Sequence, residues 1–192
     1  MGILVLGLVL LLGVHSIRVI APGMRNAGIA RLGLLPWKIV YALLSLVGLW
    51  FIIEGYGAAR LEPTVLWLPP AWTRHLAALL TLPAFVLMVC AYVPGTRIRA
   101  KLGHPMVAGV KIWAFAHLIA NGTLADLLLF GSFLVWSVVL FATLRRRDRA
   151  AGMGQPAGSA SRDAIAVVIG VAAWAVFAGW LHLVLIGVRP FG

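Results

Sequence analysis

The chain has 192 residues, of which 62% are hydrophobic and only 11% are charged. Soluble domains average about 45–50% apolar and about 25% charged residues, so the composition excludes an ordinary soluble protein and indicates an integral membrane protein. The formal net charge is +11, but the basic residues lie in short segments between apolar runs, where they set membrane topology. We therefore expect the lipid bilayer as the partner of this chain, and no nucleic acid.

Six apolar segments approach the roughly 20 residues that a helix needs to cross the hydrocarbon core of a bilayer. We expect an all-α, polytopic membrane protein, a single domain over residues 1–192 that forms a bundle of six transmembrane helices. The expected spans are residues 2–20, 37–56, 72–92, 105–120, 124–144 and 163–187.

Helix boundaries are marked by several local signals. Residues 21–36 contain Pro22-Gly23 and are expected to form a loop between the first two spans. Pro105 is well placed at the first position of the fourth span, where an N–H group would be unbonded anyway. Thr123 and Asp126 resemble a capping box for the fifth span.

The last connection and the start of the last span also carry local signals. Residues 148–160 are rich in glycine, and we expect them to form a flexible cytoplasmic loop. Either Ser161 or Asp163 is expected to cap the sixth span.

Lysine and arginine are distributed unevenly between the two sets of loops that six spans would create. By the positive-inside rule the richer side is cytoplasmic, which would place both termini on the non-cytoplasmic side. The poorer side has little beyond Arg60, Arg74 and Arg189. The richer side collects Arg18, Arg25, Arg31, Lys38, Arg97, Arg99, Lys101, Arg145, Arg146, Arg147, Arg149 and Arg162.

Three histidines lie inside the expected spans, at His15, His117 and His182. An ionisable residue within a membrane is a functional candidate by default, and a neutral imidazole is a good ligand for iron, copper or zinc. The alternative for each histidine is a hydrogen bond between helices. The chain has no CxxC motif, no HExxH motif and no carboxylate cluster, so a zinc hydrolase finds no support.

The fourth span carries the other candidate residues. Trp113, His117 and Asn121 follow one another at steps of four and therefore share one helix face. Lys111 lies at membrane depth on another face, and needs an acidic cofactor group as partner or must extend toward the cytoplasm. We expect Lys111, Trp113 and Asn121 to support a site at His117.

The sixth span places small residues beside its histidine. Ala172, Ala175, Gly179 and His182 are expected to form one stripe. Such a stripe allows the close approach of a neighbouring helix or of a flat macrocycle.

The fourth span and its flanks also resemble a known family. His104-Pro105, followed by VKIWAFAHLIANG over residues 110–122, resembles the signature of the NnrU family of bacterial membrane proteins. The segment 15–18 (HSIR), Arg25 and the stretch 32–37 are similar to that family too, and the resemblance covers essentially the whole chain. It implies a multi-pass protein of the bacterial inner (cytoplasmic) membrane that supports nitric-oxide or nitrite metabolism in denitrification, with a membrane redox partner or a reductase.

The same family includes the plant and cyanobacterial zeta-carotene isomerase, a haem b membrane enzyme that isomerises a polyene double bond. This relationship implies haem b as cofactor, with His117 of the WAFAH motif and His15 as its two ligands. The sequence departs from the isomerase at Ala114, where that enzyme has a cysteine involved in ligand switching. Action on a polyene or lipid is therefore an alternative function, and a cofactor-free assembly protein is another; no catalytic residue is identified, and whether the protein is an enzyme stays open.

Depth in the membrane adds an alternative for the second ligand. With a rise of about 1.5 Å per residue, His15 and His117 differ in depth by roughly 10–13 Å, so a haem between them would lie nearly flat in the membrane plane. His182 falls close to the depth of His117, and is the alternative second ligand.

Overall fold

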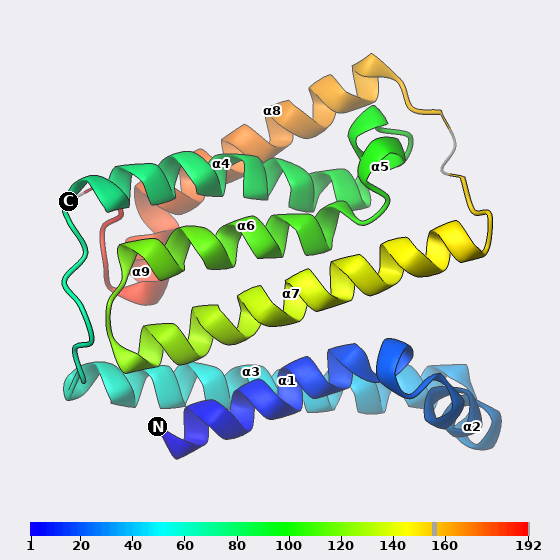
Figure 1. The fold of residues 1–192 in the computed structure, drawn as a ribbon, viewed down its shortest axis with the longest axis horizontal. Helices are drawn as coiled ribbons and strands as arrows, with labels where there is room; N and C mark the ends of the chain where they lie inside the picture. Colours follow the sequence, from blue (N-terminus) through cyan, green and yellow to red (C-terminus); the bar gives the residue numbers. More distant parts are fainter. Residues whose placement is uncertain (155–156, 192) are drawn as a thin grey trace. The chain divides into compact units, whose positions relative to one another are not determined.

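A computed structural model of the chain describes residues 1–154 and 157–191, and these residues are helical almost throughout, with no strand among them (Figure 1). The prediction of an all-α protein is confirmed. The elements are α1 (Gly2–Ile20), α2 (Pro22–Leu32), α3 (Leu34–Leu61), α4 (Trp72–Tyr92), α5 (Arg97–Leu102), α6 (Pro105–Ala120), α7 (Leu124–Ala150), α8 (Ala160–Val176), the π-helical turn η1 (Phe177–Leu181) and α9 (His182–Ile186).

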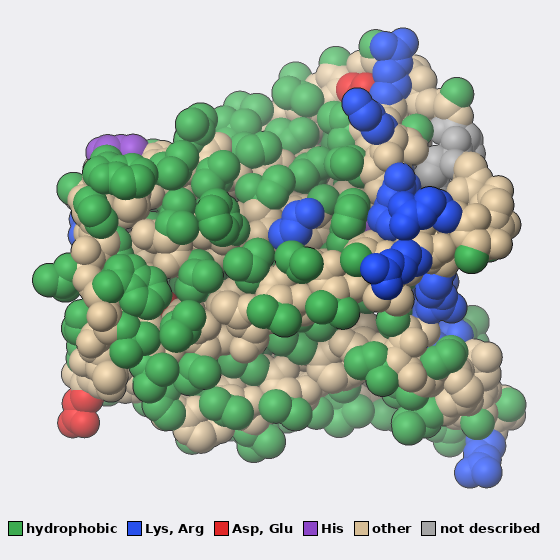
Figure 2. Space-filling model, in the orientation of Figure 1, with side chains coloured by type: hydrophobic (Ala, Val, Ile, Leu, Met, Phe, Trp, Pro, Cys, Tyr) green, Lys and Arg blue, Asp and Glu red, His purple; other side chains and the backbone are tan. Residues whose placement is uncertain are grey.

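Among the described residues, five helices are long and apolar enough to cross a membrane: α1, α3, α4, α7 and the continuous segment Ala160–Ile186. Few of their side chains are buried inside the protein, many of the exposed ones are apolar, and green apolar groups cover much of the surface in Figure 2. Water would disfavour such a surface strongly, so these apolar helices indicate a lipid bilayer environment. The remaining apolar helix, α6, is shorter, with 16 residues.

The chain divides into two compact units, and α7 begins in the first unit and continues in the second. The first unit comprises Met1–Leu66 and Thr123–Ser132, and the second comprises Trp67–Gly122 and Phe133–Gly192.

In the first unit, α1 and α3 pack as an antiparallel pair through glycines. A Cβ atom added at Gly48 would lie 2.9 Å from the backbone nitrogen of Leu11, and one at Gly55 would meet the backbone of Leu4 even more closely. Small residues allow helix backbones to approach in this way inside a membrane, where close packing replaces the hydrophobic drive. This pairing fixes α1, and with it His15, against α3.

In the second unit, α4 packs against α6 on one side and α8 on the other (Figure 1). A Cβ atom at Gly109 would lie 2.8 Å from the carbonyl oxygen of Ala84, which shows how closely α6 approaches α4. On the opposite side, the indole N–H of Trp174 donates a hydrogen bond of 3.1 Å to the hydroxyl of Thr81. The helix that carries His117 is therefore held tightly in place.

The expected helix boundaries were partly wrong. The expected loop 21–36 is mostly helical, because Pro22 begins α2 at a position that suits proline, and Gly33 supplies the positive φ of 84° that separates α2 from α3. The expected cap of the sixth span is also corrected: the side chain of Ser159, rather than Ser161 or Asp163, accepts the backbone N–H of Arg162.

Other boundary predictions are confirmed. Pro105 occupies the first turn of α6. The capping box is present: the Thr123 N–H donates to the Asp126 carboxylate over 2.9 Å, and the Asp126 N–H donates to the Thr123 hydroxyl over 3.2 Å. The expected flexible loop 148–160 is helical as far as Ala150, and its residues 155 and 156 lie outside the described residues.

Candidate functional site

His117 lies in the last turn of α6, and its ring is oriented by its own helix. Its Nδ1 lies 2.9 Å from the carbonyl oxygen of Trp113, one turn earlier. Because a carbonyl oxygen only accepts hydrogen bonds, Nδ1 must carry the proton, and the neutral ring then has its lone pair on Nε2. Backbone carbonyls hold metal-ligating histidines in this tautomer, so the ring is in the form that ligates a metal.

Aromatic and amide groups surround this histidine within the second unit. The Trp113 and His117 ring centroids are 5.1 Å apart, and Phe133 packs edge-on against Trp113 with a centroid distance of 5.5 Å. The Asn121 side chain donates a hydrogen bond of 2.8 Å to the carbonyl oxygen of His117, in the last turn of the helix, where carbonyl groups need partners from outside the helical pattern. The expected shared face of Trp113, His117 and Asn121 is thus confirmed as a set of contacts.

The end of α6 is also fixed from outside the helix. The backbone N–H of Trp67 donates to the Gly122 carbonyl over 3.1 Å, and a Cβ atom at residue 122 would overlap the carbonyl oxygen of Trp67. Ala114, one turn before His117, is fully buried. The His117 backbone therefore lies in a close-packed segment, which favours a single ring position.

Lys111 lies away from this face. Its ammonium group is 4.8 Å from the centre of the Phe141 ring, a cation–π contact between α6 and α7 within the second unit. This contact partly compensates the ammonium charge of a lysine at membrane depth. The structure does not place Lys111 among the contacts of His117.

His182 has a different setting from the one its sequence pattern suggested. The π-helical turn η1 inserts one extra residue immediately before it, which rotates all later residues relative to α8. The expected stripe from Ala172 to His182 was therefore wrong. The His182 ring packs edge-on against Phe177 at 5.8 Å, and its Nδ1 bonds the Val188 carbonyl oxygen at 2.7 Å.

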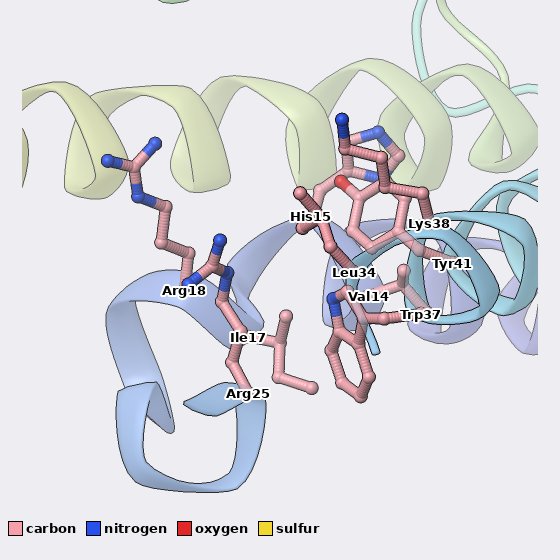
Figure 3. Close-up of a pocket in the computed structure, with 9 residues that line it drawn as sticks. All are labelled: Val14, His15, Ile17, Arg18, Arg25, Leu34, Trp37, Lys38 and Tyr41. Atoms are coloured by element: carbon pink, nitrogen blue, oxygen red, sulfur yellow. The ribbon is translucent and has the colours of Figure 1, made fainter. Parts of the chain in front are cut away.

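His15 belongs to the first unit and has the same local geometry as His117. Its Nδ1 lies 2.8 Å from the Leu11 carbonyl oxygen, and its ring is tilted against that of Tyr41 with a centroid distance of 5.3 Å. His15 also lines a pocket of about 250 Å³ between α1, α2 and α3 (Figure 3). The pocket is lined by Val14, His15, Ile17, Arg18, Arg25, Leu34, Trp37, Lys38 and Tyr41.

The three histidines thus share one feature, a ring nitrogen Nδ1 bonded to a backbone carbonyl. His117 and His182 lie in the second unit and His15 in the first, so the choice of the second ligand stays a prediction. Within the described part of the chain, no three His, Cys, Asp or Glu side chains gather as they would around a structural metal ion. A haem iron needs only two axial donors and does not require such a cluster.

Several charged residues lie in arrangements that the sequence did not predict. Arg25 and Lys38 were interpreted only as topology signals, although both line the pocket beside His15. His104 entered the sequence analysis only through the family resemblance, but its Nε2 lies 2.9 Å from the Asp148 carboxylate, 44 residues away. Neither arrangement has a local signal, because both depend on which helices pack together.

Comparisons with known proteins place the chain in a family. A search of curated proteins and a search of solved structures each found no match. The model of one family, described as NnrU protein, matches residues 3–190. The match covers the helices described above except the first residue of α1, and the chain therefore belongs to the NnrU family.

Proposed function

We propose that this protein binds b-type haem through His117 and a second histidine, and that it supports nitric-oxide or nitrite metabolism. The first choice for the second ligand is His15, and the alternative is His182. The observation that carries the proposal is the 2.9 Å contact between His117 Nδ1 and the Trp113 carbonyl, which leaves Nε2 as the nitrogen with the lone pair.

The residues around His117 fit the needs of such a cofactor. Nε2 would be the donor to iron, Trp113 would keep the ring at its angle, and the apolar helices would exclude water. Bound haem would supply an iron centre that exchanges one electron. A membrane redox partner or a reductase would then exchange electrons with this protein.

A purely structural role for the histidines is the main competing interpretation. In that role a membrane histidine uses its ring nitrogens to bond neighbouring helices. Here Nδ1 of His15 and of His117 bonds the carbonyl four residues earlier in the same helix, so only Nε2 can serve another group. In both rings Nε2 is therefore the nitrogen that haem ligation would use.

We also propose that α6 is a sixth span. At 1.5 Å per residue its 16 residues extend about 24 Å, somewhat less than the roughly 30 Å of hydrocarbon. However, α6 packs antiparallel to α4, which has 21 residues, and residues 93–104 connect the two helices (Figure 1). A helix that returns along a spanning partner crosses the same layer.

Six spans assign the sides of the membrane. In the second unit, lysine and arginine gather around α5 and the C-terminal end of α7 (Figure 2). The positive-inside rule makes this end cytoplasmic and places both termini outside, in the inner membrane of a bacterium. Reagents that label cysteines engineered at each terminus from one side of the membrane would test this orientation.

A spectrum of the purified protein tests the proposal. Expressed with ample haem supply and purified in detergent, the protein should show a Soret band and a reduced-minus-oxidised spectrum typical of b-type haem. His117→Ala should lose this absorbance while helix content is retained, and His75→Ala, at an exposed position in α4, should keep it. Comparison of His15→Ala with His182→Ala identifies the second ligand. A wild-type protein without a Soret band, or a His117→Ala variant with full haem content, would refute the proposal.

A further inference from the structure

The pocket beside His15 brings three positive charges together from three helices. Arg18 comes from α1, Arg25 from α2 and Lys38 from α3. In Figure 3 the nitrogen-bearing ends of Arg25 and Lys38 and the indole nitrogen of Trp37 are directed toward the same side of the pocket. The positive-inside rule requires only that cations lie on one side of the membrane, and it does not require them to line the same pocket.

No protein carboxylate contributes to this pocket. Among its described lining residues there is no Asp or Glu. The chain has five acidic residues, and the nearest along α3 is Glu54, which is 16 residues and about 24 Å from Lys38. Arg25 and Lys38 therefore contribute a positive potential that an anion from outside the chain would complement.

The remaining acidic residues have other roles. In the first unit, Asp126 bonds Tyr56, and Glu62 follows the C-terminal end of α3. In the second unit, Asp148 pairs with His104, and Asp163 accepts the backbone N–H of Ile98 over 3.2 Å. None of these four carboxylates is among the residues that line the pocket.

The walls of the pocket suit the other part of an amphiphilic ligand. Val14, Ile17 and Leu34 supply aliphatic surface, and Trp37 supplies an aromatic face with one N–H donor. The pocket lies at the C-terminal end of α1 and the N-terminal end of α3, where spanning helices leave the hydrocarbon layer. A lipid at this depth would present its headgroup to the cations and its chains to the walls.

The volume limits the size of the ligand. About 250 Å³ is less than the roughly 300–1,000 Å³ of pockets that enclose drug-sized molecules. A headgroup or a small oxyanion suits this volume, whereas a whole macrocycle would not be enclosed by it. Basic pockets at the cytoplasmic ends of membrane helices are typical sites for anionic lipid headgroups.

We propose that Arg25 and Lys38 form a site for a phosphate-type oxyanion, carried by an anionic membrane lipid or present as free phosphate. The guanidinium of Arg25 can bond two phosphate oxygens at once, and Lys38 adds a point charge. This site is independent of whether His15 ligates haem, because its cations do not require the iron.

Lipid retention and thermal unfolding of the full chain test this site. The protein would be stripped of lipid in detergent and then exposed to vesicles of phosphatidylcholine, to vesicles that also contain phosphatidylglycerol, or to inorganic phosphate. The wild type should retain phosphatidylglycerol and unfold at a higher temperature with it. Arg25→Gln/Lys38→Gln should bind it at least about tenfold more weakly, since two charge-assisted contacts are lost.

A matched control removes the same charge elsewhere. Arg31 and Arg146 are exposed, do not line the pocket and belong to the same expected cytoplasmic side, so Arg31→Gln/Arg146→Gln should bind like the wild type. Lys38→Gln alone, at an exposed position, serves if the double variant does not fold, and should bind more weakly than Lys38→Arg. Stabilisation by inorganic phosphate alone, lost in the same variant, supports the site and identifies free phosphate as its ligand.

Two results would overturn the proposal. One is equal retention of phosphatidylglycerol and equal response to phosphate in Arg25→Gln/Lys38→Gln and in the control. The other is loss of haem absorbance from that variant with lipid retention unchanged, because the cations would then serve the carboxylates of the cofactor. Lipid retention and haem absorbance are separate readouts, so failure of one proposal is distinguishable from failure of the other.

Discussion

The carboxylate of Asp126 is the acceptor for three donors in the first unit, and its removal should be measurable as a loss of stability. Asp126 is 5% exposed. It accepts the Tyr56 hydroxyl at 2.5 Å, the Thr123 hydroxyl at 2.7 Å and the Thr123 N–H at 2.9 Å. Hydrogen bonds to charged groups contribute about 1.5–3 kcal/mol and a helix cap about 0.5–2 kcal/mol, but bonds that share one carboxylate are not additive. We expect Asp126→Ala to lower the free energy of unfolding by about 3 kcal/mol.

Tyr56→Phe removes only one of these bonds. Side-chain hydrogen bonds in membrane proteins contribute about 0.6 kcal/mol on average and up to about 1.7 kcal/mol, and we expect the upper part of this range. For a chain of this length 1 kcal/mol corresponds to about 2–4 °C, so thermal unfolding in detergent should shift by about 6–12 °C for Asp126→Ala and about 2–6 °C for Tyr56→Phe. Tyr92→Phe, at a side chain that is 77% exposed, is the control without a shift.

The double variant decides whether the bond between Tyr56 and Asp126 is responsible. If it is, Tyr56→Phe should have almost no further effect once Asp126 is alanine. An equal cost of Tyr56→Phe in both backgrounds would show that the hydroxyl does not stabilise the protein through Asp126. Asp126→Ala should also keep any haem absorbance, because a capping role does not involve the cofactor.

Two further substitutions test helix packing by the same unfolding measurement. Gly48→Ala should destabilise the protein by about 1–3 kcal/mol, because its Cβ would press on the backbone of Leu11. The control is Gly57→Ala in the same helix, where the added Cβ meets nothing and the change should be neutral or stabilising. Equal effects of the two substitutions would contradict the close contact of α1 and α3. Trp174→Phe should cost about 0.6 kcal/mol through loss of the bond to Thr81, and Trp180→Phe, at an exposed position, should cost nothing; a cost at both positions would point to ring size instead.

The hydrophobic pattern predicted the membrane helices well because each apolar run has a length set by the bilayer. The expected spans 2–20 and 72–92 coincide with α1 and α4. The pattern underestimated the second span, because the helix continues beyond its apolar part as far as Leu61. Helical structure at a membrane surface needs no apolar run, and for this reason α2 was missed.

The candidate site was predictable where it depends on one helix and not where it depends on several. Steps of four residues correctly placed Trp113, His117 and Asn121 on one face, since α6 is regular. The same rule failed at His182, because no local signal announced the π-helical turn before it. The pairing of His104 with Asp148 depends on the packing of distant segments, which a sequence pattern does not encode.

The composition of α2 explains why a pocket forms beside His15 at all. Its 11 residues extend about 16 Å, too short to cross a bilayer, and Arg25, Asn26 and Arg31 keep it from entering the hydrocarbon layer. It nevertheless packs closely on α3, because the Trp37 ring occupies the space above Gly28, where a Cβ atom would collide with it. Because Trp37 fixes α2 in this position, Arg25 lies beside the C-terminal end of α1. The charge of Arg25, which could otherwise lie in water, therefore lines a pocket with apolar walls.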